Sequence, residues 1–185
     1  MAVTPDIAAQ EAGVVPIRHR AGLVVDAIDQ ALMNTQLHYL GMAARTSAPL
    51  RRLAVLTCMD ARIDVAALLG LRLGEAHVIR NAGGRATTDA LHALAISQVI
   101  LKTREVMVLH HTECVLGSYR QSELAERIIV ATHHPFSDEL GCFLDLSESV
   151  IEDLARIRSY PYLVHRDRVR GFIYDLASNK VSEVA

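Results

Sequence analysis

A thiol, a carboxylate and a guanidinium occupy alternate positions in the stretch LTCMDARID, as Cys58, Asp60 and Arg62. The stretch overlaps the end of an apolar run, residues 53–57, whose composition predicts a buried β-strand. Alternate residues of a strand face the same side, so the three side chains would converge if the strand continued through them. This spacing indicates a reactive site at the end of the strand.

A second reactive group, His110, His111 and Cys114, lies in the stretch LHHTEC at the end of another apolar run, residues 105–110. Two thiolates and an imidazole suit Zn²⁺, which is tetrahedral and, in catalytic sites, keeps one position for water. We therefore predict Cys58, His111 and Cys114 as ligands of one zinc ion. Neighbouring strand residues face opposite sides, so His110 is expected to pack elsewhere. A redox pair or disulfide between Cys58 and Cys114 is the alternative.

Asp60 admits three interpretations. Arg62 can hold its carboxylate in a bidentate pair, away from the metal, which leaves room for a water molecule there. Zinc lowers the pKa of a bound water towards about 7, and Asp60 could then orient the resulting hydroxide. Alternatively, Asp60 swings to the zinc as a fourth ligand and closes the site at lower pH, or it forms only a structural ion pair. Cys142 could also serve as a fourth ligand, but its apolar context, ELGCFL, favours a core residue.

The elements that must position these groups alternate between strand and helix. The predicted strands are residues 53–57, 76–80, 105–110 and 171–176, and the predicted helices are residues 63–69, 88–101, 119–131 and 147–158. This alternation predicts an open, mainly parallel α/β sheet flanked by helices. Ligands bind such sheets beyond the carboxyl ends of the strands, where the chain order reverses, so the first and third strands are expected to be neighbours.

One predicted helix and the N-terminal region differ from the rest. Residues 88–101 are apolar nearly all round, so this helix is expected to be buried. Residues 21–45 have helical spacing and follow an irregular segment, residues 1–20. We predict a single domain, residues 1–185, in which residues 1–50 form an N-terminal extension and helical arm and residues 51–185 form the zinc-containing core.

The composition excludes several classes of function. The formal charge of −2 gives no general attraction for nucleic acid. No apolar run approaches the roughly 20 residues that span a bilayer, so no membrane association is expected. The first residues lack the basic and apolar regions of a secretory signal, so we expect a cytoplasmic protein whose thiols stay reduced.

The motifs CMDAR and HTEC, together with GEAHVIRNAGG and RGFIYDLASNKVSEV, resemble those of the β-class carbonic anhydrases. The resemblance covers roughly residues 50–185. It implies that the zinc ligands are Cys58, His111 and Cys114. It also implies a catalytic dyad, Asp60 and Arg62, and a glycine turn beside the substrate pocket, Gly83 and Gly84.

The resemblance further implies a mainly parallel α/β fold and one zinc ion per chain. The implied reaction is the reversible hydration of CO₂ to bicarbonate by zinc-bound hydroxide. It also implies a homodimer or higher homo-oligomer, in which the N-terminal helix embraces the partner.

Two flanking residues depart from the pattern of many family members. His110 and Val115 stand where those members have glycine, and the HHT variant resembles a short bacterial branch that includes carbonyl sulfide hydrolases. Hydrolysis of carbonyl sulfide or carbon disulfide is therefore an alternative to CO₂ hydration. A non-catalytic bicarbonate or redox sensor is an alternative of another class.

Overall fold

The structure is a computed structural model that describes residues 28 and 47–184 of the 185-residue chain. Apart from Ile28, the predicted arm and the segment before it lie outside the described residues. Five strands form one sheet in the order β2-β1-β3-β4-β5. The strands are β1 (Leu53–Cys58), β2 (Ala76–Asn81), β3 (Glu105–His111), β4 (Val169–Asp175) and β5 (Lys180–Glu183). The first four in this order pair in parallel and β5 is antiparallel to β4, which confirms the predicted mainly parallel sheet.

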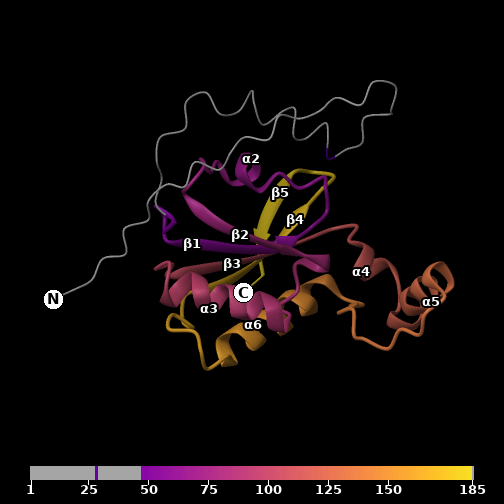
Figure 1. Cartoon of the computed structure of the whole chain (residues 1–185). Helices are drawn as coiled ribbons and strands as arrows, with labels where there is room; N and C mark the ends of the chain where they lie inside the picture. The colour runs from indigo at the N-terminus through magenta and orange to yellow at the C-terminus, as the bar shows by residue number, and fades with distance from the viewer. Residues whose placement is uncertain (1–27, 29–46, 185) are drawn as a thin grey trace, which may run out of the picture. The chain divides into compact units, whose positions relative to one another are not determined.

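Helices flank the sheet, and their bounds are α2 (Val65–Leu69), α3 (Thr88–Val99), α4 (Val115–Ser118), α5 (Gln121–Thr132) and α6 (Leu146–Ser159). A 3₁₀ helix, η1 (Ala82–Gly84), follows β2. Figure 1 shows α3 and α6 on one face of the sheet and α2 on the other. The short elements α4, β5 and η1 were not predicted from the sequence. None of the helices in the described part of the chain is long and apolar enough to span a membrane.

Strand β1 is the most deeply buried element, because apolar layers cover both of its faces. Ala54 and Leu56 pack in one apolar cluster with side chains of α3 and α6. Val55 packs in a second cluster, which includes Val65 of α2 and Leu109 of β3. A strand covered on both faces carries a nearly continuous apolar sequence, and this is why residues 53–57 show no polar alternation.

Helix α3 is less buried than its composition predicts. Leu91 and Leu94 face the sheet and are buried, whereas the side chains of Ile96 and Val99 are 57% and 45% exposed. The prediction of a buried helix is therefore correct for the side that faces the sheet and wrong for the other side. The helix packs on the sheet along one side, and no described element covers its other side.

The order of the strands brings the carboxyl ends of β1 and β3 together. The chain runs from β1 to β2 on one side of β1 and then crosses to β3 on the other side. The crossovers therefore diverge at this point, which is where open α/β sheets bind ligands. The hydroxyl of Thr57 donates a 2.7 Å hydrogen bond to the carbonyl of Leu109 and fixes the two strand ends side by side.

Candidate metal centre

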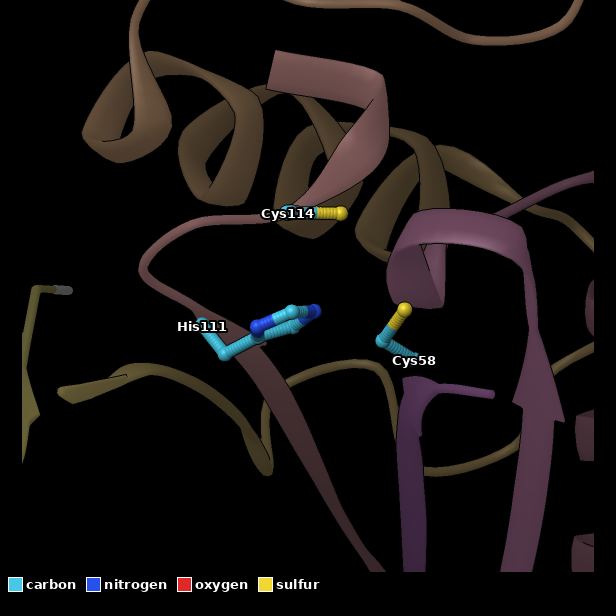
Figure 2. A group of neighbouring side chains, drawn as sticks. All are labelled: Cys58, His111 and Cys114. Carbon is cyan, nitrogen blue, oxygen red and sulfur yellow. The ribbon is translucent and has the colours of Figure 1, made fainter. Parts of the chain in front are cut away.

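Cys58, His111 and Cys114 meet at these strand ends, as predicted. Cys58 is the last residue of β1, His111 is the last residue of β3, and Cys114 is the N-cap of α4. Their ligand atoms all lie within 4.8 Å of one another, and all three residues are buried. In Figure 2 the two sulfur atoms and the imidazole ring point into one shared space. This arrangement can hold a metal ion.

The hydrogen bonds of His111 leave one ring nitrogen available to a metal. Its Nδ1 lies 2.8 Å from the carbonyl of Thr112. A carbonyl can only accept, so Nδ1 carries the proton and donates it, and Nε2 keeps a free lone pair. Nε2 is buried and has no hydrogen-bond partner among the described residues. Such an orphaned, oriented nitrogen, together with two sulfur donors, fits a tetrahedral zinc site with three protein ligands.

The two thiols are electrostatically coupled. A hydrogen bond from Cys114 is the main cause that lowers the pKa of Cys58 to about 4, assisted by His111 and by backbone amides that include that of Gly83. The resulting thiolate raises the pKa of Cys114 far above its usual range. Burial disfavours the imidazolium form of His111, but the Cys58 thiolate outweighs this and raises the pKa of His111. A bound cation would offset the repulsion between two thiolates.

Arg62 holds Asp60 in a two-pronged ion pair beside the cluster. Nε of Arg62 donates to Oδ1 of Asp60 at 3.0 Å and Nη2 donates to Oδ2 at 2.8 Å. These bonds hold the pKa of the Asp60 carboxyl well below its usual range. Oδ2 lies 4.0 Å from Nε2 of His111, so the carboxylate borders the position of the metal.

The convergence of Asp60 with Cys58 does not come from strand geometry. Strand β1 ends at Cys58, and Asp60 and Arg62 lie in the turn that follows it. Arg80 at the end of β2 holds this turn, because its Nε donates to the carbonyl of Cys58 at 2.9 Å and its Nη2 donates to that of Asp60 at 2.6 Å. Sequence reasoning missed Arg80, although it lies within the stretch GEAHVIRNAGG.

Glu113 is a second residue that the sequence reasoning missed. Nη1 of Arg62 donates to Oε2 of Glu113 at 2.8 Å, and Nη2 of Arg62 lies 3.3 Å from the Glu113 carbonyl oxygen. The Arg62 guanidinium therefore connects the turn after β1 with the loop between His111 and Cys114. A second carboxylate inside the HTEC motif was the available signal.

Gly83 and Gly84 are buried and pack against the metal cluster rather than forming an open turn. Gly83 has φ of 73° and Gly84 has φ of 70°, which disfavours residues with a Cβ atom. A Cβ atom on Gly84 would lie 2.8 Å from the backbone nitrogen of Cys58. The glycines therefore allow the backbone after β2 to approach the first sulfur donor. Their direct contact with substrate stays a prediction.

Replacing Gly84 by alanine is expected to destabilise the protein more than the same change at Gly70. Gly70 has φ of 61°, but a Cβ atom there would meet nothing within 4 Å. The Gly70 variant thus measures the backbone cost alone, about 1–2 kcal/mol, whereas the Gly84 variant adds a steric cost of about 1–3 kcal/mol. Denaturant unfolding measures both, and equal losses would contradict the close approach to Cys58.

Two further sequence-predicted positions lie near the cluster but outside it. Val115, the first residue of α4, is 48% exposed, so it lies at the surface beside Cys114. Cys142 is a half-buried free thiol that packs against the second apolar cluster, consistent with the predicted core role. Among the described residues, the metal-binding group contains Cys58, His111 and Cys114 and does not include Cys142.

Comparison with known proteins places these residues in a family context. A family model described as carbonic anhydrase matches residues 53–136. β-Carbonic anhydrase 1 of Mycobacterium tuberculosis is 40% identical over 136 residues, which cover 74% of this chain and 83% of that protein. A carbon disulfide hydrolase of Acidianus sp. is 26% identical over 155 residues, which cover 71% of this chain and 76% of that protein.

The fold agrees with these sequence matches. A crystal structure of carbonic anhydrase from Streptococcus mutans superposes with a TM-score of 0.83 at 36% identity. The superposition covers 88% of this chain and 100% of that one. The carbonic anhydrase from Glaciozyma antarctica superposes with a TM-score of 0.71 at 34% identity, covering 86% of this chain and 96% of that one.

Proposed function

Because the chain belongs to the β-carbonic anhydrase family, whose members use zinc, we propose that it reversibly hydrates carbon dioxide to bicarbonate and a proton with one zinc ion per chain. The observation that carries the proposal is the buried cluster of Cys58, His111 and Cys114 with its orphaned Nε2 nitrogen. The ion pair of Asp60 and Arg62 borders this cluster and supplies a group for orienting a nucleophile.

Each residue of the site has a separate task in this reaction. Cys58 and Cys114 supply thiolates, and His111 supplies the free lone pair of Nε2 as the third donor. Zinc bound there would act as a Lewis acid that brings the pKa of a bound water towards about 7. Asp60, kept ionised by Arg62, accepts a hydrogen bond from the attacking water. This bond directs the remaining lone pair of the water oxygen at the carbon of CO₂. The released proton passes to solvent or buffer.

Carbon disulfide hydrolysis is the second candidate, because several relatives bear that name. Carbon dioxide, carbonyl sulfide and carbon disulfide are all linear electrophiles, so the metal donors and Asp60 do not distinguish among them. The three mycobacterial relatives named β-carbonic anhydrase 1 are 40% identical to this chain, whereas the relatives named carbon disulfide hydrolase are 26% identical or less. This difference favours CO₂ as the substrate.

Stopped-flow CO₂ hydration on zinc-analysed protein tests the proposal, with carbonyl sulfide and carbon disulfide as competing substrates. We expect one zinc per chain and hydration of CO₂ that is fast compared with sulfide release. Negligible CO₂ hydration with rapid release of hydrogen sulfide would instead identify a carbon disulfide or carbonyl sulfide hydrolase. Zinc without turnover of any of the three would favour a binding or sensor protein.

We also propose that the chain forms a homodimer or larger homo-oligomer and acts in the cytoplasm. Large apolar side chains near the site are exposed in the single chain, including Met59, Val115 and Leu144. Association with another copy of the chain would cover such side chains. Two β-carbonic anhydrases of Sordaria macrospora with the same fold are described as tetrameric. The free thiols of Cys58 and Cys114 suit a reducing compartment.

A further inference from the structure

Three polar residues with no task in the proposed reaction lie buried behind the metal cluster. They are Arg85, His110 and Asp153, and we refer to them as the buried triad. The side chains of His110 and Asp153 are 1% and 0% exposed, and that of Arg85 is 6% exposed. Burying charged groups is costly unless they are paired, so their contacts carry information about their role.

Asp153 of α6 contacts both other members through one oxygen atom. Its Oδ2 lies 3.2 Å from Nε of Arg85 and 3.1 Å from Nε2 of His110. Arg85 also donates from Nη2 to Oε2 of Glu152 at 2.9 Å, so two consecutive carboxylates of α6 hold its guanidinium. Helix α6 is thereby connected to the segment after β2 and to the end of β3.

His110 is also held by α6 at its other ring nitrogen. The hydroxyl of Ser149 lies 2.9 Å from Nδ1 of His110 and 2.7 Å from the carbonyl oxygen of Leu146. Ser149 and Asp153 are one helical turn apart on α6 and lie at the two nitrogen atoms of the ring. The orientation of His110 is therefore fixed from one helix.

Two members of the buried triad are sequence neighbours of residues that belong to the metal cluster or contact it. Arg85 directly follows Gly84, whose Cα approaches the Cys58 backbone so closely that a Cβ atom does not fit. His110 directly precedes His111, and both belong to β3. The Asp153 carboxylate thus contacts two segments of the chain. One carries the donor His111, and the other packs against the donor Cys58.

The third donor is connected to the buried triad through Phe143. The ring of Phe143 stacks on His110 with centroids 6.2 Å apart, and its centroid lies 5.7 Å from Cζ of Arg85. A Cβ atom on Gly117 in α4 would lie 2.7 Å from this ring, so α4 packs directly against it. Cys114 is the N-cap of α4.

We propose that Asp153 is a positioning residue that, through Arg85 and His110, sets the spacing of Cys58 and His111 in the metal site. The inference rests on the proposed zinc function. Stability alone does not explain why these three buried residues are polar, because apolar side chains of similar volume often give a protein that is as stable or more stable. Its position accounts for it, because it contacts the end of β3, which carries His111, and the segment that packs against Cys58. Residues that hold metal ligands from outside orient them and tune the metal.

Cobalt substitution of the full chain tests the proposal without reference to turnover, because thiolate-to-cobalt absorption reports the geometry of the donors. The test variant is Asp153→Asn, which keeps the shape of the side chain and removes its charge. We expect an altered cobalt spectrum and about tenfold weaker metal binding, as is found for residues that orient ligands. A second, double variant combines Arg85→Met with Asp153→Leu and so removes both charges of this ion pair. It is expected to fold and to show the same altered cobalt spectrum.

The matched control is Ile157→Ala, which lies one turn further along α6 in the apolar cluster. It is expected to unfold at a lower temperature and to keep the native cobalt spectrum and affinity. Native spectra and affinities in both test variants, or an equal change in the control, would overturn the positioning role alone. If the unmodified protein gave no thiolate-to-cobalt absorption, this result would contradict the proposed metal site and therefore also the positioning role.

Discussion

The Cys58→Ser variant is expected to lose its zinc and to hydrate CO₂ about a thousandfold more slowly, since a Lewis-acid metal supplies several kcal/mol and about 1.36 kcal/mol corresponds to tenfold in rate. A serine hydroxyl stays protonated at neutral pH and is a harder donor than a thiolate, so it binds zinc poorly. The structure adds that Cys58 shares the cluster with two other buried donors, and the group found among the described residues contains these three and no fourth.

Cys142 provides the matched control for this loss. It is the third cysteine of the chain, is half-buried, and lies outside the metal-binding group. The Cys142→Ser variant is therefore expected to retain one zinc per chain and full hydration activity. Metal analysis and stopped-flow assays of both variants provide the comparison. Retention of zinc and activity in Cys58→Ser would remove Cys58 from the site.

The Asp60→Asn variant is expected to keep its zinc but to lose about a hundredfold in kcat, at the lower end of what a positioned acid–base group contributes. The asparagine amide cannot accept hydrogen bonds from both Nε and Nη2 of Arg62, because one carboxylate oxygen is replaced by an NH₂ group that donates. The nucleophile would then lose its orienting acceptor, whereas the three donors of the metal would be unchanged.

Asp64 offers a matched control for the same chemical change four residues away. Its carboxylate caps α2 by accepting from the amide of Ala67 at 3.0 Å, and asparagine caps helices about as well as aspartate. Asp64→Asn should therefore leave both zinc content and kcat unchanged. Native kcat in Asp60→Asn would eliminate the orienting role, and loss of zinc in that variant would indicate that Asp60 is a metal ligand.

The pattern of apolar runs was sufficient to predict the main strands and helices and the parallel sheet. Residues 53–57 and 105–110 were predicted as strands, and each extends one residue further, to Cys58 and His111. The exposed side of α3 was not predictable, because an apolar helix is compatible with one covering layer or with two. Strand β5 was missed because it is four residues long and fully exposed, so it carries no apolar pattern.

The candidate site was predicted from residue types but partly for an incorrect geometric reason. Alternation along a strand was expected to bring Cys58, Asp60 and Arg62 together, whereas β1 ends at Cys58 and a turn carries the other two. Arg80 imposes that turn by holding two of its carbonyl groups. An arginine next to a glycine motif gives no sequence signal of such a contact, because the partner belongs to a neighbouring strand.

The sequence by itself determined the chemistry that is available to this protein, because thiolates, an imidazole and a paired carboxylate have fixed donor properties wherever they lie. Only the tertiary structure decided that these groups meet. The order of β1 and β3 in the sheet brings Cys58 to His111, and α6 places Asp153 behind both segments. Contacts between residues far apart in the chain depend on packing that minimises the free energy of the whole domain, and local sequence patterns do not encode those distances.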